Sequence, residues 1–114
     1  MKMKTVSPPA QAFEKLRARA ADACLVLKAM SNPDRLMLLC MMMDVERSVG
    51  ELETLTGIRQ PTLSQQLGIL RVEELVHTRR EGKNIFYTLA NATVAELMHT
   101  LYEAYCVNSP EKMK

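Results

Sequence analysis

The sequence has few aromatic residues: three tyrosines, two phenylalanines and no tryptophan in 114 residues. A chain of this length can bury a hydrophobic core without disulfides or structural metals. With so few aromatic rings, that core must be largely aliphatic. Nine methionines are available to fill its irregular gaps.

Neither sign of charge dominates, because 15 basic residues face 13 acidic ones and leave a net charge of +2. This is too little to indicate a nucleic-acid partner by itself, so any basic surface must come from placement or from doubling in an oligomer. No apolar run approaches a membrane span, and the polar start of the chain lacks the apolar segment of a signal peptide. We therefore expect a cytoplasmic protein that does not bind membranes.

Cysteine is also scarce, with only Cys24, Cys40 and Cys106, which are odd in number and widely separated. In a reducing compartment they are not expected to form a static disulfide framework. The chain has no Cys-x-x-Cys pair, no glycine-rich phosphate loop and no nucleophile beside an obvious base. These absences argue against a thiol enzyme such as a sulfur-transfer catalyst, and we predict no enzymatic activity and no cofactor.

One domain is predicted over residues 10–107, between a loose arm (1–9) that ends in Pro8-Pro9 and a short tail (108–114). A helical pattern runs from about Ala10 to Met30. Its apolar stripe is formed by Phe13, Leu16, Ala20, Cys24 and Leu27. On this stripe Cys24 is interpreted as a small buried hydrophobe in a helix interface.

A second helix should start at Asn32, which can cap it, with Pro33 in the first turn and Asp34 complementing the positive helix end. It is predicted to run to about Met43. The predicted inner side carries Leu36, Leu39, Cys40 and Met43. The run Cys-Met-Met-Met could suggest a soft metal, but methionines at helical spacing favour core packing. Residues 44–48 are predicted to be a polar connection.

The stretch from Gly57 to Arg71 is predicted to form one helix with two unlike faces. Leu63, Leu67 and Leu70 make an apolar stripe that can anchor it. The other side carries Thr62, Ser64 and Gln65 beside Gly68, and such short uncharged side chains suit base edges in a major groove. Pro61 fits a first helical turn, a short helix is predicted over 51–56, and Gly57 can make the turn between them. Together they predict a helix-turn-helix, the alternative being an ordinary helical hairpin.

Two β-prone runs, 76–80 and 85–89, flank a charged turn that contains Gly82 and predict a hairpin. Near its tip Arg79, Arg80 and Lys83 face the single acid Glu81. A basic hairpin directly after a helix-turn-helix is typical of a wing that contacts phosphates or the minor groove. The alternative is a solvated turn.

A last helix is predicted from about Ala92 to Val107. Its seam comprises Val94, Leu97, Leu101 and Ala104. At about 100° per residue Cys106 lies off this seam, on the side of His99 and Tyr102. Cys106 is therefore not expected to be a core residue.

With these elements in order, residues 10 to 107 resemble the ArsR/SmtB family of bacterial winged-helix repressors. The resemblance is carried by residues 31–36 (Ser-Asn-Pro-Asp-Arg-Leu), 60–67 (Gln-Pro-Thr-Leu-Ser-Gln-Gln-Leu), 79–83 (Arg-Arg-Glu-Gly-Lys) and Tyr87. It implies a mainly α winged helix-turn-helix with a small β-hairpin that forms a homodimer through its first and last helices. Two reading helices would then bind successive major grooves of a palindromic duplex operator, roughly 34 Å apart.

Eight residues are predicted to contact that DNA. Thr62, Ser64 and Gln65 should read bases, while Arg79, Arg80 and Lys83 should contact the backbone. Arg59 and Gln60, at the entrance of the reading helix, could also contact phosphate.

The resemblance implies that DNA is released when a ligand or thiol chemistry changes the geometry of the dimer, and the usual metal sites of the family can be compared with this chain residue by residue. Where many relatives carry a cysteine pair this chain has Ser48 and Gly50. The places of a second family metal site, between paired final helices, hold Asn91, Thr93, Ala104 and Val107. His77 and His99 are lone histidines, interpreted as ordinary surface or interface residues. No metal is therefore predicted.

The remaining pair, Cys40 and Cys106, resembles the sulfide-responsive dithiol branch of the family, the BigR/SqrR branch. There a cysteine in each of these two helices forms a di- or polysulfide bridge with reactive sulfur species. A direct disulfide requires Cα atoms within about 7 Å, and extra sulfur atoms would span a wider gap. Cys106, off the apolar seam, is the expected attacking thiolate and Cys40 the resolving thiol.

Two alternatives keep the fold. One is a repressor that binds a thiophilic metal or metalloid through cysteine thiolates. The other is a winged helix used only for protein contacts, which the basic wing argues against and which salt-dependent binding to duplex DNA would exclude.

Overall fold

The computed structural model of the chain describes residues 9–107, so all but the last residue of the predicted arm (1–9) and the whole predicted tail (108–114) lie outside the described residues. The predicted helices and hairpin are present. The elements in chain order are α1 (Ala10–Met30), α2 (Pro33–Met41), β1 (Arg47–Ser48), α3 (Val49–Thr56), α4 (Thr62–Val72), β2 (Val76–Glu81), β3 (Asn84–Leu89), α5 (Ala92–Tyr102) and the π-helical turn η1 (Glu103–Val107). No helix within the described residues is long and apolar enough to cross a membrane.

The core lies where α2, α3 and α4 pack together under the base of α5, and it is aliphatic as predicted. Its fully buried side chains are Leu38, Leu39, Met42, Leu52, Leu63, Leu70, Leu75 and Met98. The predicted inner side of α2 is only partly right, because Leu36, Cys40 and Met43 are half-buried. Leu38 and Leu39 sit at the centre of the core, whereas Leu36 and Cys40 turn toward α5.

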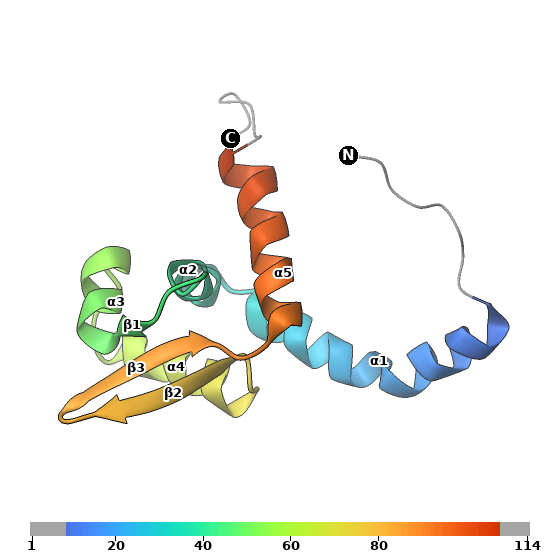
Figure 1. Cartoon of the computed structure of the whole chain (residues 1–114), viewed down its shortest axis with the longest axis horizontal. Coiled ribbons are helices and arrows are strands. Elements are labelled where there is room, and N and C mark those ends of the chain that lie inside the picture. The colour runs from blue at the N-terminus through green and yellow to red at the C-terminus, as the bar shows by residue number, and fades with distance from the viewer. Residues whose placement is uncertain (1–8, 108–114) are drawn as a thin grey trace.

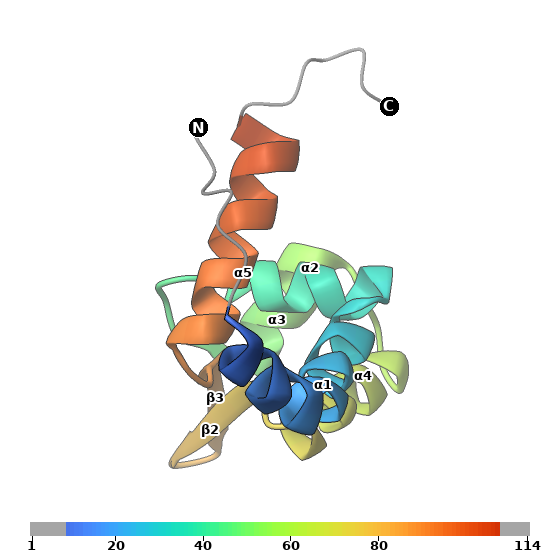
Figure 2. The ribbon, with the colours of Figure 1, turned by 90° about the vertical axis from the view of Figure 1, so that its right-hand side faces the viewer.

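Helix α1 has the predicted bounds but is buried only at its C-terminal end, at Ala29 and Met30. It leads away from the rest of the molecule in Figure 1, and in Figure 2 it therefore points toward the viewer. Phe13 and Leu16, on the predicted apolar stripe, are about half exposed, and Cys24 is exposed as well. The expectation that Cys24 is buried is therefore wrong for the single chain, because no element within residues 9–107 covers this face of α1.

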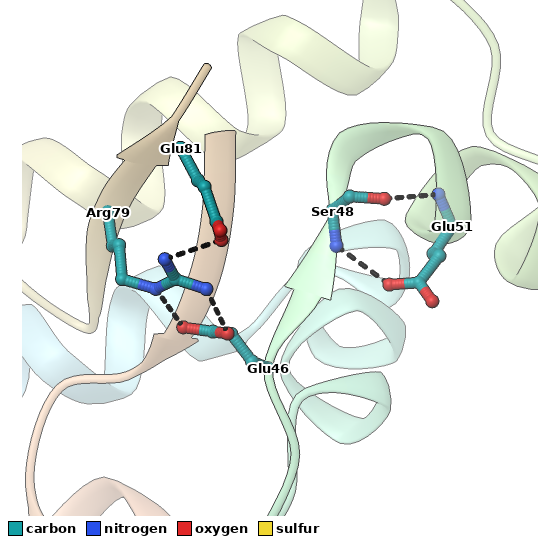
Figure 3. Close-up of polar contacts among 5 residues, drawn as sticks. All are labelled: Glu46, Ser48, Glu51, Arg79 and Glu81. Atoms are coloured by element: carbon teal, nitrogen blue, oxygen red, sulfur yellow. Dashed lines mark hydrogen bonds and ion pairs between the residues drawn. The ribbon is translucent and has the colours of Figure 1, made fainter. Parts of the chain in front are cut away.

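The sheet has three antiparallel strands in the order β1-β3-β2, not only the predicted hairpin. Arg47 and Ser48 pair with Tyr87 and Phe86 of β3, so the end of the predicted polar connection is a strand. A run of two residues is too short to show the alternation that marks a strand. Ser48 then starts α3 through a capping box, in which its hydroxyl accepts from the Glu51 N–H while the Glu51 carboxylate accepts from the Ser48 N–H (Figure 3).

The last helix differs from the prediction in its seam and in its end. Val94 and Met98 are its buried residues, with Leu97 and Leu101 packed beside them, while Ala104 is exposed. The α-helix stops at Tyr102, and η1 continues it with a wider turn. A π turn inserts an extra residue relative to α-helical spacing, and such turns are frequent at functional sites.

Candidate DNA-reading surface and thiol pocket

The reading helix α4 is anchored by burial of one face. Leu63 and Leu70 are 0% exposed and Leu67 is 2% exposed. On the other side Ser64, Gln65 and Gly68 are exposed, and Thr62 is half-buried at the helix start. The structure therefore places the predicted base readers on one accessible face, opposite a rigid anchor.

This helix begins at Thr62 and not at Gly57, so the predicted start is wrong. Residues 57–61 form the loop between α3 and α4 instead. Gly57 ends α3 in the left-handed conformation (φ 76°), which favours glycine because it has no Cβ. Ile58 is then buried in the core, and this contact fixes the loop between the helices. Pro61 occupies the N-cap position, one residue before the predicted first turn.

Gln60 and Arg59, the two residues predicted at the entrance of the reading helix, differ in whether the side chain has a partner within residues 9–107. The side-chain oxygen of Gln60 accepts a hydrogen bond from the Ser64 N–H at 3.1 Å, so it satisfies one of the unpaired donors at the start of α4. Arg59 is exposed. Gln60 therefore acts within the chain as a cap, whereas Arg59 is accessible to a phosphate.

Sequence reasoning missed the role of Arg35, at the start of α2. Its guanidinium donates to the carbonyl of Ala29 at 2.6 Å and to the side-chain oxygen of Gln66 at 2.8 Å. Arg35 thus joins the end of α1 to the reading helix. The only sequence signal was its place in the run Ser-Asn-Pro-Asp-Arg-Leu that carried the family resemblance.

In the wing, the three predicted cations are not equivalent. Arg79 is bound by two carboxylates: its Nε and Nη2 donate to Glu46 at 2.8 and 2.7 Å, and its Nη1 donates to Glu81 at 2.9 Å (Figure 3). The guanidinium also lies 4.8 Å from the centre of the Phe86 ring. Because β3 lies between β2 and β1, Arg79 reaches across the sheet to the segment that precedes β1.

These contacts stabilise the charged forms of both partners. The hydrogen bond from Arg79 lowers the pKa of the Glu46 carboxyl, and the same bond raises the pKa of Arg79. By contrast, Arg80 and Lys83 are exposed and make no ion pair within residues 9–107. Arg80 and Lys83 are therefore free to meet a phosphate, whereas Arg79 is engaged within the chain.

The two cysteines predicted to act together, Cys40 and Cys106, line one apolar pocket between α2 and the end of α5, which we call the thiol pocket. The pocket has a volume of about 230 Å³. Its other walls are Leu36, Met37, Met98, Leu101, Tyr102 and Tyr105. Cys40, on α2, is half-buried, and Cys106, on η1, is exposed. Burial raises the pKa of the Cys40 thiol, and the nearby Cys106 raises it further.

The third cysteine and the histidines lie elsewhere. Cys24 is on α1 and does not line the thiol pocket. His99 contacts Asp44 at 3.1 Å, a pairing between α5 and the loop after α2 that sequence reasoning missed. Within residues 9–107 no group of three or more histidine, cysteine, aspartate or glutamate side chains is arranged to hold a metal ion.

A helix-turn-helix formed by α3 and α4, followed by the β2–β3 hairpin of a three-stranded sheet, defines a winged helix-turn-helix protein. Residues 32–78 match the family described as bacterial regulatory protein, arsR family. Over 109 residues the chain is 45% identical to the biofilm growth-associated repressor of Xylella fastidiosa, with 96% of each chain covered. The chain belongs to the arsR family of bacterial regulatory proteins. It is a transcriptional regulator, and this DNA-binding class is not enzymatic.

Solved structures agree with this assignment. The crystal structure of the transcriptional repressor BigR from Xylella fastidiosa is 50% identical, with a TM-score of 0.75 over 82% of this chain and 95% of that one. Reduced HlyU from Vibrio cholerae is 42% identical, with a TM-score of 0.77 over 82% and 98%. The homodimeric winged helix-turn-helix DNA-binding domain of Mb0332 from Mycobacterium bovis is 31% identical, with a TM-score of 0.69 over 87% and 86%.

Proposed function

We propose that the chain is a cytoplasmic homodimeric repressor that binds duplex operator DNA and releases it when Cys40 and Cys106 become linked. The observation that carries the proposal is the shared apolar pocket of these two thiols, which come from helices far apart in the sequence. The likeness to proteins named as repressors supports the DNA-binding half.

Dimer formation is supported by α1. This helix leaves Phe13, Leu16, Leu25 and Leu27 about half exposed, a larger apolar stripe than a solvent-facing helix needs. A second copy of the chain would cover it, as would be expected from the likeness to a homodimeric domain. The exposed tyrosines Tyr102 and Tyr105 near the end of the last helix offer further apolar surface.

On DNA, Thr62, Ser64 and Gln65 would read base edges from the exposed face of α4. Arg59, Arg80 and Lys83 would contact phosphates and fix the orientation of the protein on the duplex. Arg79 and Gln60 remain predicted contacts, but their side chains must first leave the in-chain partners described above.

The signal would be a persulfide, and the difference between the two thiols suggests the order of events. The exposed Cys106 thiolate attacks the outer sulfur of R–S–SH, gives Cys106–S–SH and expels RS⁻. Cys40 then loses its proton and attacks the Cys106 Sγ, which forms the Cys40–Cys106 disulfide and expels HS⁻. The two protein thiols lose two electrons, and the transferred sulfur is reduced to sulfide.

A longer link forms in the same way. The Cys106 persulfide first takes a further sulfur from a second R–S–SH, again expelling RS⁻. Cys40 then attacks the middle sulfur and expels HS⁻, which leaves a trisulfide. Either link ties η1 to α2, and α2 packs directly against α4. The link would therefore move the last helix relative to the body that carries the reading helix.

The test is operator binding by fluorescence anisotropy with reduced protein and again after treatment with a persulfide donor, followed by intact mass and peptide mapping. We expect the reduced protein to bind and the treated protein to release DNA with a Cys40–Cys106 link. Cys40→Ser and Cys106→Ser should bind but not release, whereas the matched control Cys24→Ser should respond as wild type. Normal release by either pocket variant would exclude the dithiol mechanism, and release by a metal or metalloid instead would favour a thiolate metal sensor.

A further inference from the structure

Arg35 forms side-chain hydrogen bonds to two different helices, the end of α1 and the reading helix α4. Its backbone N–H is bound by the Asn32 side chain at 3.0 Å, which fixes the start of α2. Its Nε donates to the Ala29 carbonyl at 2.6 Å, one of the carbonyls that the end of α1 leaves without a helical partner. A guanidinium at a helix C-terminus also complements the helix dipole.

A second nitrogen of the same guanidinium, Nη1, contacts the reading helix α4. Nη1 donates to the Gln66 side-chain oxygen at 2.8 Å, across 31 positions of sequence. Gln66 is half-buried on α4, directly beside the exposed base reader Gln65. One planar group therefore connects the end of α1 to the helix that faces DNA, and the rigid geometry of its N–H groups makes that connection directional.

The leucines that anchor α4 in the core lack this directionality. Leu63, Leu67 and Leu70 hold it by burial, and apolar contacts do not specify rotation about the helix axis as closely as a hydrogen bond does. We infer that Arg35 is a positioning residue that fixes the pose of α4 relative to α1 and thereby sets the half-site spacing that the dimer accepts. This inference rests on the proposed function, in which α1 joins the two copies.

The consequence concerns spacing and not overall affinity. In a dimer joined through α1, the angle between α1 and α4 determines the distance and rotation between the two reading helices. Half-sites must match that geometry at about one helical turn of DNA, and one inserted base pair changes both their separation and their relative rotation. If the Arg35–Gln66 contact is lost, α4 can adjust and the penalty for a wrong spacing should fall.

The experiment first selects a palindromic duplex with wild-type protein from a random pool. Duplexes with one base pair added or removed at the centre are then compared with it by fluorescence anisotropy, all with reduced protein. For wild type we expect affinity to fall by about tenfold or more on the altered duplexes. Gln66→Leu, which cannot accept from Arg35, should reduce that penalty to within about threefold.

Gln66→Glu is the conservative variant, since its carboxylate still accepts from Arg35, and it should keep the wild-type penalty. Its added charge weakens binding to every duplex alike and cancels from the ratio. A general loss of stability would also lower affinity on all duplexes equally, so it would not reproduce the effect. Arg35→Lys should behave as Gln66→Leu, because an ammonium lacks the fork that serves both partners.

An unchanged penalty in Gln66→Leu would overturn the inference. So would an equal loss of the penalty in Gln66→Leu and Gln66→Glu, because Gln66 would then act through DNA and not through Arg35. If wild type selects no palindrome, the proposed function itself fails. If wild type selects a palindrome and loses affinity on altered spacings, and the variants lose as much, the proposed function stands and only the role of Arg35 is excluded.

Discussion

The reading helix and the wing both belong to the proposed DNA-binding surface, but they differ in how much they depend on exposed ion pairs. Helix α4 is anchored by three leucines that are almost completely buried. The wing is held by the pairing of β3 with β1 and by two buried residues, Val76 and Tyr87, and an exposed polar contact is added, in which Arg79 of β2 spans the sheet to Glu46 (Figure 3). High salt screens an exposed ion pair and acid neutralises its carboxylate, whereas neither removes the burial of apolar side chains. The base-reading element should therefore keep its position under conditions that loosen the wing.

The largest expected effect comes from removing the anchor of α4. Leu67→Ala should lower the free energy of unfolding by about 2–5 kcal/mol, the usual cost of a cavity at a buried leucine. Ile69→Ala, on the same helix but 39% exposed, is the matched control and should cost clearly less. Urea unfolding of the reduced protein measures both. Equal losses would mean that burial does not distinguish the two faces of α4.

The second effect concerns the face of α4 opposite the anchor. Gln65→Ala should reduce discrimination at one operator position by about 1–3 kcal/mol, because a bidentate base contact is lost. Thermal stability should stay near wild type, since the side chain is exposed. Competition between the selected duplex and its single-base variants measures the loss. A uniform weakening on all duplexes would instead place Gln65 at the DNA backbone.

The third effect separates the cations of the wing. Lys83→Ala should weaken binding to all sequences and reduce the slope of log affinity against log salt by about one. Arg79→Ala should leave that slope near wild type, because two carboxylates already neutralise the guanidinium. Titrations at several salt concentrations give both slopes. An equal loss in both variants would show that Arg79 leaves Glu46 to contact phosphate.

The smallest effect is the pH dependence of the wing contact. The pKa of the Glu46 carboxyl is lowered in the folded protein by its bond to Arg79, so this contact stabilises the fold above the ordinary carboxyl range and is lost as pH falls through the lowered pKa. Wild type should therefore melt slightly above Glu46→Gln at neutral pH, and the difference should vanish in acid. A difference that persists in acid would mean that the ion pair is not its source.

Local signals were enough to predict most elements of the fold. Asn32 caps α2 as expected, Gly57 makes the turn between the helices, and the hairpin has its predicted place. Each of these depends on residues within a few positions of one another. The bounds of α1 matched for the same reason, because its long periodic pattern lies between two proline-containing runs, Pro8-Pro9 and Ser31-Asn32-Pro33.

Features that depend on contacts between residues far apart in the chain could not be predicted from the sequence. Strand β1 exists only because it pairs with β3, and the engagement of Arg79 depends on Glu46, 33 positions away. The end of the α-helix at Tyr102 has no local marker in the sequence. The grouping of Cys40 and Cys106 was expected from the family resemblance, whereas the apolar walls of their pocket required the packed structure.

The uncovered face of α1 has a consequence for gene dosage. If operator binding requires two copies joined along this helix, dimer formation and DNA binding are linked by mass action. At low protein levels the occupied fraction then rises with the square of the protomer concentration, so halving the protein reduces occupancy by about fourfold. Apolar residues such as Phe13 and Leu16 would thereby make repression a steep function of how much of the regulator the cell contains.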